Sequence, residues 1–233
     1  MIITAADFTF DRYLAGDNGD HCIIHGDCRD VLPKIPDKVI DLVLTDPPYG
    51  VRKKEEWDDE QHFRENIIRM LKLTRCVSSR VIWFCADKMM AEIVATRPFD
   101  LFRVLVWNKP AGSQFAGASH NKIWYSSELI LLFGDKEDFK SVGTAKRMTY
   151  SVYDDRTLPF SEFNHPTPKP IDLIQWLCEN HSNDGHLILD PFLGSGTTLV
   201  AAKNLGRRAI GIEINYEYCK IAEQRLAQEV LSL

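Results

Sequence analysis

The sequence has no long apolar run, no cysteine pair of the metal-binding kind and no excess of basic residues. A membrane helix needs ~18 consecutive apolar residues, and residues 1–20 lack the basic-then-apolar order of a secretory signal. The six cysteines include no Cys-x-x-Cys pair, and neither Cys22 nor Cys28 has a histidine at a zinc-binding spacing. These absences predict a cytosolic protein with reduced, mostly structural cysteines, no metal site and no membrane partner.

The net charge of −5 excludes a general polycation. It leaves nucleic acid open as a partner, because binding needs only a local basic face. The 233 residues contain no internal repeat or low-complexity tract, and their number fits one sizeable domain. We therefore expect a single domain over residues 1–233, in which residues 135–164, where hydrophobic periodicity is lost, form a small insert.

What is present is an alternation of apolar runs with amphipathic segments. The runs predict strands at residues 21–25, 39–44, 80–85, 101–107, 128–133, 185–190 and 209–212. The amphipathic segments and their caps predict helices at 61–77, 87–95 and 171–181, near 29 and 197, and from about 216 to 230. Strands that alternate with helices indicate an α/β fold, a parallel sheet with helices on both faces.

The stretch Thr45 to Gly50 ends the run at 39–44 with the residues Thr-Asp-Pro-Pro-Tyr-Gly. Pro47 and Pro48 cannot donate to a sheet ladder, and proline keeps the preceding Asp46 out of the helical region. This predicts a rigid loop at the carboxyl end of a strand, where open α/β sheets bind ligands. The Asp46 carboxylate, the Pro47 carbonyl and the Tyr49 ring suit a flat heterocycle that carries an exocyclic amine.

A second loop, Asp190 to Thr198, lies between a predicted strand and a predicted helix. Its glycines allow the backbone to approach a ligand closely, and the helix N-terminus favours electron-rich groups. The loop lacks the lysine of a phosphate-binding Walker motif and the third glycine of a dinucleotide fingerprint. Glu213 follows the glycines by about twenty residues, where an acid normally accepts from ribose hydroxyls.

Asp27, just after the strand at 21–25, has two interpretations that stay open. It holds the donor group of a ligand, or it caps the helix that begins near Arg29. The charged segment 51–60 is likewise either a flap that reaches phosphate or a solvated linker. Residues 135–164 alternate basic with aromatic side chains, as nucleic-acid surfaces do, although acids stand among them. The candidate nucleic-acid contacts are Arg52, Lys53, Lys136, Lys146 and Arg147.

The motifs taken together resemble the amino-methyltransferases of DNA. The resemblance rests on Asp46–Tyr49, His165–Pro170, Asp190–Thr198 and Gly211–Glu213. The catalytic loop precedes the cofactor loop, an order similar to that of the permuted β group of DNA methyltransferases. The resemblance implies a Rossmann-like, mostly parallel sheet of seven strands with one antiparallel strand, and a target-recognition role for residues 135–164.

The resemblance also implies S-adenosylmethionine as cofactor, double-stranded DNA as partner, and a homodimer as a state frequent in the group. Glu213 would hold the cofactor ribose, and Asp27 would accept from its adenine amine. The loop from Asp190 to Thr197 would cradle the methionine end, with Thr167 and Lys169 in the same pocket. The implied cofactor-binding residues are Asp27, Thr167, Lys169, Asp190, Phe192, Gly194, Ser195, Gly196, Thr197 and Glu213.

The implied catalytic residues are Asp46, Pro47, Pro48 and Tyr49. We expect the Asp46 carboxylate and the Pro47 carbonyl each to accept one hydrogen of the target amine, so that the nitrogen lone pair points at the sulfonium methyl. Positioning of this kind can lower a barrier by up to ~7–11 kcal/mol. The base must be flipped out of the duplex, at a cost of a few kcal/mol. Stacking on Tyr49 would offset part of that cost.

An aspartate at the first position of this motif favours adenine N6 in the family, where serine is commoner in cytosine-N4 enzymes. Cytosine N4 or an RNA target remains the alternative within the same chemistry. A non-catalytic regulator that keeps the fold is disfavoured by the intact Asp46 and Tyr49. A nicotinamide oxidoreductase is disfavoured by the absent third glycine and by the Pro-Pro-Tyr loop.

Overall fold

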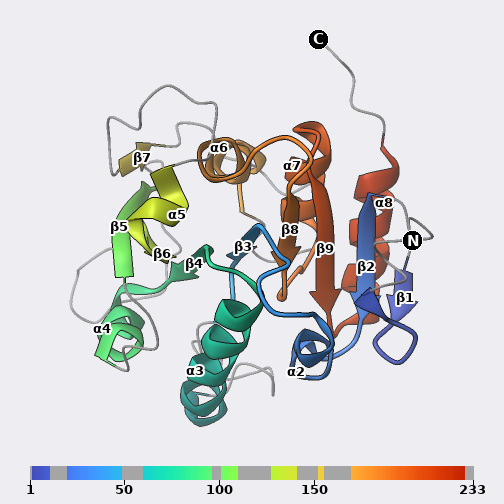
Figure 1. Cartoon of the computed structure of the whole chain (residues 1–233), viewed down its shortest axis with the longest axis horizontal. Coiled ribbons are helices and arrows are strands. Elements are labelled where there is room, and N and C mark those ends of the chain that lie inside the picture. The colour runs from blue at the N-terminus through green and yellow to red at the C-terminus, as the bar shows by residue number, and fades with distance from the viewer. Residues whose placement is uncertain are drawn as a thin grey trace.

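The computed structural model describes residues 2–10, 20–48, 60–95, 101–109, 127–140, 152–154 and 169–228. Their strands are β1 (Ile2–Thr4), β2 (His21–His25), β3 (Leu42–Thr45), β4 (Val81–Cys85), β5 (Leu101–Asn108), β6 (Ser127–Phe133), β7 (Val152–Asp154), β8 (Leu187–Asp190) and β9 (Arg208–Glu213). The helices are α2 (Cys28–Val31), the 3₁₀ turn η1 (Leu32–Lys34), α3 (Glu60–Val77), α4 (Asp87–Ala95), α5 (Lys136–Lys140), α6 (Ile171–His181), α7 (Thr197–Asn204) and α8 (Tyr216–Ala227). Figure 1 shows these elements as one sheet with helices around it.

The described strands form a single sheet in the order β1-β2-β9-β8-β3-β4-β6-β5-β7. Every neighbouring pair is parallel except β4·β6 and β5·β6, so β6 is the one reversed strand among them. The mostly parallel α/β fold with one antiparallel strand is therefore confirmed. The expected number of seven strands is too low, because the short strands β1 and β7 extend the two edges to nine.

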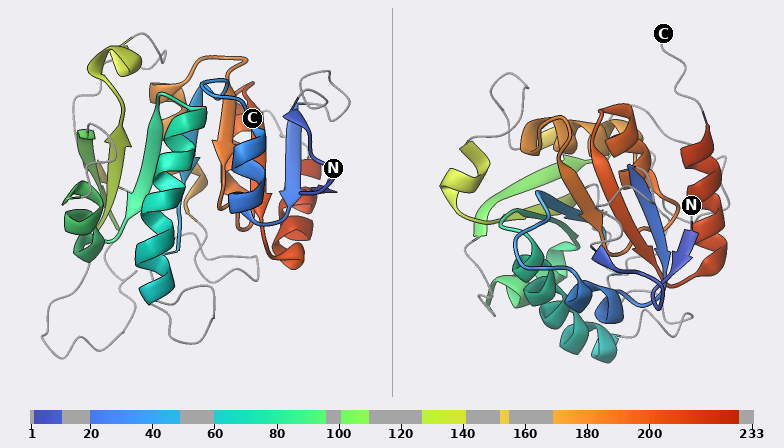
Figure 2. Two further views of the ribbon diagram at one scale, coloured as in Figure 1. Left: turned by 60° about the horizontal axis from the view of Figure 1, so that its bottom comes forward. Right: turned by 45° about the vertical axis from the view of Figure 1, so that its right-hand side comes forward.

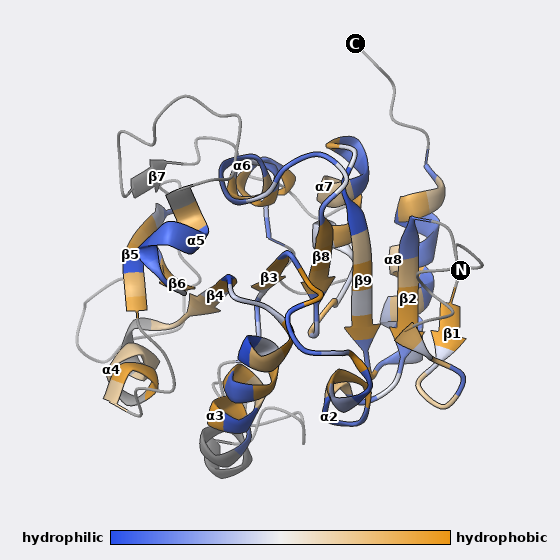
Figure 3. Cartoon of the chain, in the orientation of Figure 1, coloured by the Kyte–Doolittle hydropathy of each residue, from blue (hydrophilic) through white to orange (hydrophobic). Residues whose placement is uncertain are grey.

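Helices cover both faces of the sheet, as the two views of Figure 2 show. Side chains along the inner strands alternate between the two faces, as a strand requires. Val81 and Trp83 of β4 belong to one apolar cluster, with residues of α2, α3 and α4. Ile82 and Phe84 belong to the other, with residues of α6, α7 and α8. Figure 3 shows the result as apolar inner strands beneath helices that are apolar on one side only.

The predicted elements agree closely with those observed. The helix predicted at 171–181 is α6 itself, and the strands predicted at 21–25 and 80–85 are β2 and β4, the latter one residue shorter. Residues 135–164 contain α5 and β7, for which the sequence predicts nothing. All six cysteines are free thiols, and all but Cys76 are buried. None of the described helices is both long and apolar enough to span a membrane.

The parallel strands bring distant residues to one edge of the sheet. Their carboxyl ends lie together, so the segments after β2, β3, β8 and β9 emerge side by side. Because β6 runs the other way, its first residues reach that same edge, paired with the last residues of β5. This carboxyl edge holds the loops that the sequence singles out.

Candidate active site

Asp190, the last residue of β8, connects the two predicted loops, residues 45–50 and 190–198, through hydrogen bonds. Its Oδ1 accepts a hydrogen bond from Thr45 Oγ1 at 2.8 Å and one from the Phe192 amide at 3.1 Å. Its Oδ2 accepts from Thr198 Oγ1 at 2.6 Å. Burial raises the pKa of Asp190 to about 6, although the hydrogen bonds from Thr198 and Thr45 oppose that shift. Asp190 therefore connects the end of β3 with the loop after β8 and the start of α7.

The glycine turn between β8 and α7 requires glycine at two positions. Gly194 and Gly196 have positive φ angles of 55° and 89°. A Cβ atom on Gly196 would lie 2.7 Å from the Cβ of Ala222 in α8. The Glu213 carboxylate, at the end of β9, accepts the Gly194 amide at 2.8 Å through Oε2 and the Asn215 amide at 2.8 Å through Oε1. Glu213 thus lies directly against the glycine turn, and its predicted contact with the cofactor ribose stays a prediction.

Arg225 of α8 supports this turn from the side, a role that sequence reasoning missed. Its Nη1 donates to the Ser195 carbonyl at 2.8 Å, to Ser195 Oγ at 3.1 Å and to Thr197 Oγ1 at 3.1 Å. Ser195 and Thr197 are buried. An arginine in an amphipathic helix carries no local signal of an inward contact, so nothing in the sequence pointed to it.

Asp27 is the N-cap of α2, which was one of its two interpretations. Its Oδ1 accepts the Arg29 amide at 2.8 Å, and its Oδ2 forms an ion pair with the Arg29 guanidinium at 2.5 Å. Burial would raise the pKa of Asp27, but Arg29 outweighs burial and holds that pKa below its usual value. The neighbouring Gly26 amide donates to the Glu213 carbonyl at 2.9 Å, so the Asp27 turn lies beside Glu213. A contact of Asp27 with the cofactor adenine stays a prediction.

Two large hydrophobic side chains of the described residues are exposed, and both adjoin Glu213. Ile214 is 59% exposed and Tyr216 is 50% exposed. The Tyr216 ring lies 5.2 Å from the ring of His25, the last residue of β2. The edge therefore presents an open apolar and aromatic surface next to a carboxylate.

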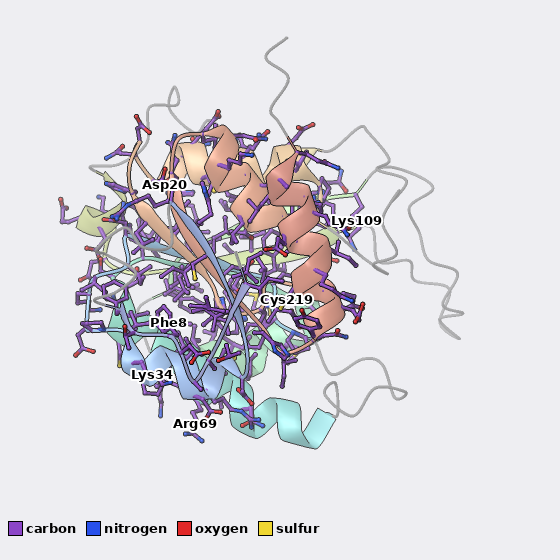
Figure 4. The ribbon with its side chains drawn as sticks, turned by 90° about the vertical axis from the view of Figure 1, so that its right-hand side faces the viewer. Phe8, Asp20, Lys34, Arg69, Lys109 and Cys219 are labelled. Atoms are coloured by element: carbon purple, nitrogen blue, oxygen red, sulfur yellow. The ribbon has the colours of Figure 1, made fainter. Side chains whose placement is uncertain are left out.

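Asp46 lies at the same edge, immediately after β3, and its side chain is 30% exposed. Lys169 Nζ lies 2.5 Å from Asp46 Oδ2 and 3.1 Å from Glu128 Oε2. Lys109 Nζ in turn lies 2.5 Å from Glu128 Oε1; Lys109, which follows β5, is labelled in Figure 4. The sequence predicts Lys169 in the cofactor pocket, and the structure shows its ammonium in ion pairs with Asp46 and Glu128. Its role toward the cofactor stays a prediction.

The ionisation of this group follows from its ion pairs. Burial would lower the pKa of Lys169, but Asp46 and Glu128 outweigh burial and raise it. Burial would raise the pKa of Glu128, yet Lys169 and Lys109 hold it below its usual value. Both side chains are therefore charged at neutral pH. Sequence reasoning missed Glu128 and Lys109, and an acid at the start of the apolar run 128–133 was the signal available.

Several predicted site residues lie outside the described residues. They are Tyr49, Arg52, Lys53, Lys146, Arg147 and Thr167. Of the catalytic loop, Asp46, Pro47 and Pro48 are described, and Pro47 is buried. Of the candidate DNA contacts, Lys136 is described, as the exposed first residue of α5. DNA contacts and a homodimer therefore stay predictions.

A model of the DNA methylase family matches residues 40–224, well over half of the 233 residues. The chain belongs to this family. The predicted resemblance to β-group DNA methyltransferases is thereby confirmed. The chain is similar to the DNA adenine methyltransferase YhdJ of Escherichia coli, with 27% identity over 242 residues, 88% of this chain and 82% of YhdJ.

Solved structures agree with this assignment. TTHA0409 of Thermus thermophilus, complexed with S-adenosyl-L-methionine, has 26% sequence identity and a TM-score of 0.71, over 91% of this chain and 96% of that one. The PvuII DNA methyltransferase, which is cytosine-N4-specific, has a TM-score of 0.71 at 18% identity, over 91% of this chain and 88% of that one. The second likeness shows the fold alone, so a shared fold does not distinguish the two bases.

Proposed function

We propose that the protein transfers a methyl group from S-adenosylmethionine to the N6 amine of an adenine flipped out of double-stranded DNA. The observation that carries the proposal is the placement of Asp46. Its carboxylate is partly exposed, paired with a buried ammonium, and opens on the same sheet edge as the glycine turn and Glu213. A carboxylate beside a cofactor turn can accept a hydrogen of an aromatic amine that is to be methylated.

The residues of the edge fit the cofactor. The Gly194 turn brings backbone close to a ligand. Glu213 keeps acceptor capacity, because a carboxylate offers about four lone-pair sites and the amides of Gly194, Ile214 and Asn215 occupy part of them. Ile214 and Tyr216 supply exposed apolar surface for a flat ring. When bound, S-adenosylmethionine supplies an electrophilic methyl group. Glu213 would hold its ribose, and the turn at residues 194–197 would hold its methionine end.

The chain itself makes the target amine reactive. An aromatic amine is a weak nucleophile, because its lone pair is delocalised into the ring. Asp46 and the Pro47 carbonyl each accept one amine hydrogen, which draws the nitrogen toward tetrahedral geometry. The proton that the nitrogen loses passes to Asp46, directly or through water. Tyr49 stacks on the flipped base and offsets part of the unstacking cost.

Adenine is the base that the residues favour. Asp46 opens the motif where cytosine-N4 enzymes more commonly carry serine, and YhdJ, a similar protein, is a DNA adenine methyltransferase. The second candidate is cytosine N4, the base named for the PvuII enzyme, because a fold shared with that enzyme does not distinguish the two bases. Both candidates use the same acceptor and the same cofactor.

The test is to incubate the protein with S-adenosylmethionine and unmethylated genomic DNA, then to analyse the nucleosides by mass spectrometry. We expect N6-methyladenine. Asp46→Ala should lower its formation at least ~100-fold, the cost of losing a positioned catalytic group. Asp37→Asn, an exposed aspartate outside the site, is the control. N4-methylcytosine would replace the proposed base, and no methylated base in DNA would contradict the proposal.

A further inference from the structure

We propose that Lys169 positions Asp46 for the reaction, and that Glu128, itself held by Lys109, keeps this lysine in place. The proposal rests on the proposed function and deepens it, because it names what orients the acceptor of the target amine. It gives Lys169 a task different from lining the cofactor pocket.

The four side chains form a row in which the charges alternate in sign. One ammonium, that of Lys169, bridges Asp46 Oδ2 at 2.5 Å and Glu128 Oε2 at 3.1 Å. The other oxygen of Glu128 faces Lys109 Nζ at 2.5 Å. Each carboxylate therefore faces an ammonium, and Glu128 separates the two positive charges. Lys169 and Asp46 are 123 residues apart in the chain, so only the fold brings them together.

Within the row, Glu128 is the residue whose position is fixed by the sheet. Glu128 of β6 is paired with Trp107 of β5, so the ladder sets its position. The Trp107 ring lies 5.8 Å from Lys169 Nζ and 5.2 Å from Lys109 Nζ. The Phe84 ring lies 5.2 Å from Lys169 Nζ on another side. Cations over aromatic faces are attracted to them. Lys169 is thus enclosed by two carboxylates and two rings.

Stability alone is a weak reason for such an arrangement. The side chains of Lys169 and Glu128 are 10% and 15% exposed. Burying charges costs free energy that a packed apolar cluster of the same volume avoids. The row ends, however, at Asp46, the partly exposed carboxylate that we propose as the acceptor of the target amine. Its position points to a task in the reaction.

That task is to hold Asp46 ionised and in one orientation. A nearby cation favours the charged form of a carboxylate, and an ammonium on one oxygen leaves acceptor sites for the amine. In the reaction the nitrogen–carbon bond forms while the carbon–sulfur bond breaks, with its electron pair going to sulfur. The nitrogen becomes positive before it loses a proton to Asp46 or water. Glu128 balances the charge of Lys169, which would otherwise oppose that positive nitrogen.

The first test compares Lys169→Met, which removes the charge, with Lys169→Arg, which keeps it. Lys72→Met, at an exposed position of α3, is the control. Single-turnover methyl transfer is measured at saturating DNA and S-adenosylmethionine, and cofactor affinity is measured by calorimetry. We expect Lys169→Met to slow the reaction about 100-fold, as a misplaced catalytic group does, with cofactor affinity unchanged. Lys169→Arg should recover part of the rate.

The opposite result, a loss of cofactor affinity with an unchanged single-turnover rate, would overturn the proposal. If Lys169→Met weakens cofactor binding and leaves the saturated rate as it was, the lysine lines the cofactor pocket instead. If Lys169→Met does not fold, Lys169→Gln and Glu128→Gln make the same comparison, since each breaks the row at one member. Glu128→Gln should lower the rate as well, because it releases the lysine from its anchor on the sheet.

A second readout needs no turnover. Carbon-13 NMR follows the titration of the Asp46 carboxylate, assigned with Asp46→Asn. The charged groups that face it among the described residues are Lys169 and, from β8, Asp190, with Glu128 and Lys109 behind the lysine. Removing the adjacent cation should move the titration midpoint to higher pH. An unchanged midpoint contradicts the proposal, whereas a shift in a protein that transfers no methyl group places the failure in the proposed function.

Discussion

Asp190 and Asp46 lie at one edge of the sheet and differ in burial and in hydrogen bonding. Asp190 is buried and accepts three hydrogen bonds from the loops around it. Asp46 follows Thr45, which donates to Asp190, and its side chain is 30% exposed. The buried carboxylate organises the backbone, and the partly exposed one is the acceptor that we propose for the target amine.

The buried carboxylate should make stability depend on pH. Burial raises the pKa of Asp190 to about 6 in the folded protein, above its value of 3.8 in the unfolded chain. The folded state thus binds more protons between these two values, and stability falls as pH rises through them. From pH 5 to pH 7 this group should cost about 1 kcal/mol of unfolding free energy. Urea unfolding of the wild type and of Asp190→Asn at several pH values checks this: their difference in stability should change by that amount in favour of the variant.

The glycine turn provides a second test at the level of one residue. Gly196→Ala should destabilise the fold by about 1–3 kcal/mol, because the position has a φ of 89° and its Cβ would collide with Ala222. Gly185→Ala is the matched control, since Gly185 has a φ of 74° but nothing within 4 Å of an added Cβ. Thermal unfolding of both variants separates collision from backbone strain. Equal losses would mean that the contact between an added Cβ and Ala222 of α8 contributes nothing.

At the scale of elements, α5 shows that the segment 135–164 is anchored at its start. Phe139 is 8% exposed. Its ring stacks on Phe102 of β5 at 5.0 Å and meets His181 of α6 edge-on at 5.4 Å. The first turn of the expected insert is therefore packed into one of the two apolar layers, although its role in recognising a DNA sequence stays a prediction.

This packing predicts a contrast between two residues of one short helix. Phe139→Ala should lower the unfolding free energy by about 3 kcal/mol, as other buried aromatic truncations do. Lys136→Ala, at an exposed position, should change it by less than about 0.5 kcal/mol. If Lys136 contacts phosphate, its replacement should also reduce the salt slope of DNA binding by about 1. Urea unfolding and DNA titrations at several salt concentrations measure the two effects.

At the scale of the whole molecule, the cofactor and the target should act on separable parts of the edge. A ligand at 100 times its Kd stabilises the folded state by about 2.7 kcal/mol. S-adenosylmethionine should therefore raise the stability of the wild type and of Asp46→Asn alike, because the proposed partner of Asp46 is the target amine. Glu213→Ala should lose the effect. Calorimetric melting with and without cofactor measures this stabilisation. If Asp46→Asn is no longer stabilised by the cofactor, the cofactor and the target do not act on separable parts of the edge.

The sequence predicts much of the molecule, and the limits have physical causes. Long buried strands and the helix α6 are predicted because their hydrophobic periodicity is complete. The strands β1 and β7 have three residues each, too few to show a period of two. Asp27 had two local interpretations, of which the structure shows the helix cap, whereas the contact with a ligand stays a prediction. The contact of Lys169 with Glu128 could not be predicted, because sequence spacing says nothing about side chains that the sheet order brings together.

The reversed strand β6 has one more consequence, for how such an enzyme can change over time. Asn108 at the end of β5 is paired with Ser127 at the start of β6. The connection between them therefore leaves and re-enters the sheet at neighbouring points beside the active site. Lengthening a connection whose ends are already held together costs little free energy. Insertions or deletions between Lys109 and Ser127 should therefore leave Asp46 and Glu128 in place, so selection can change the length of this connection without rebuilding the fold.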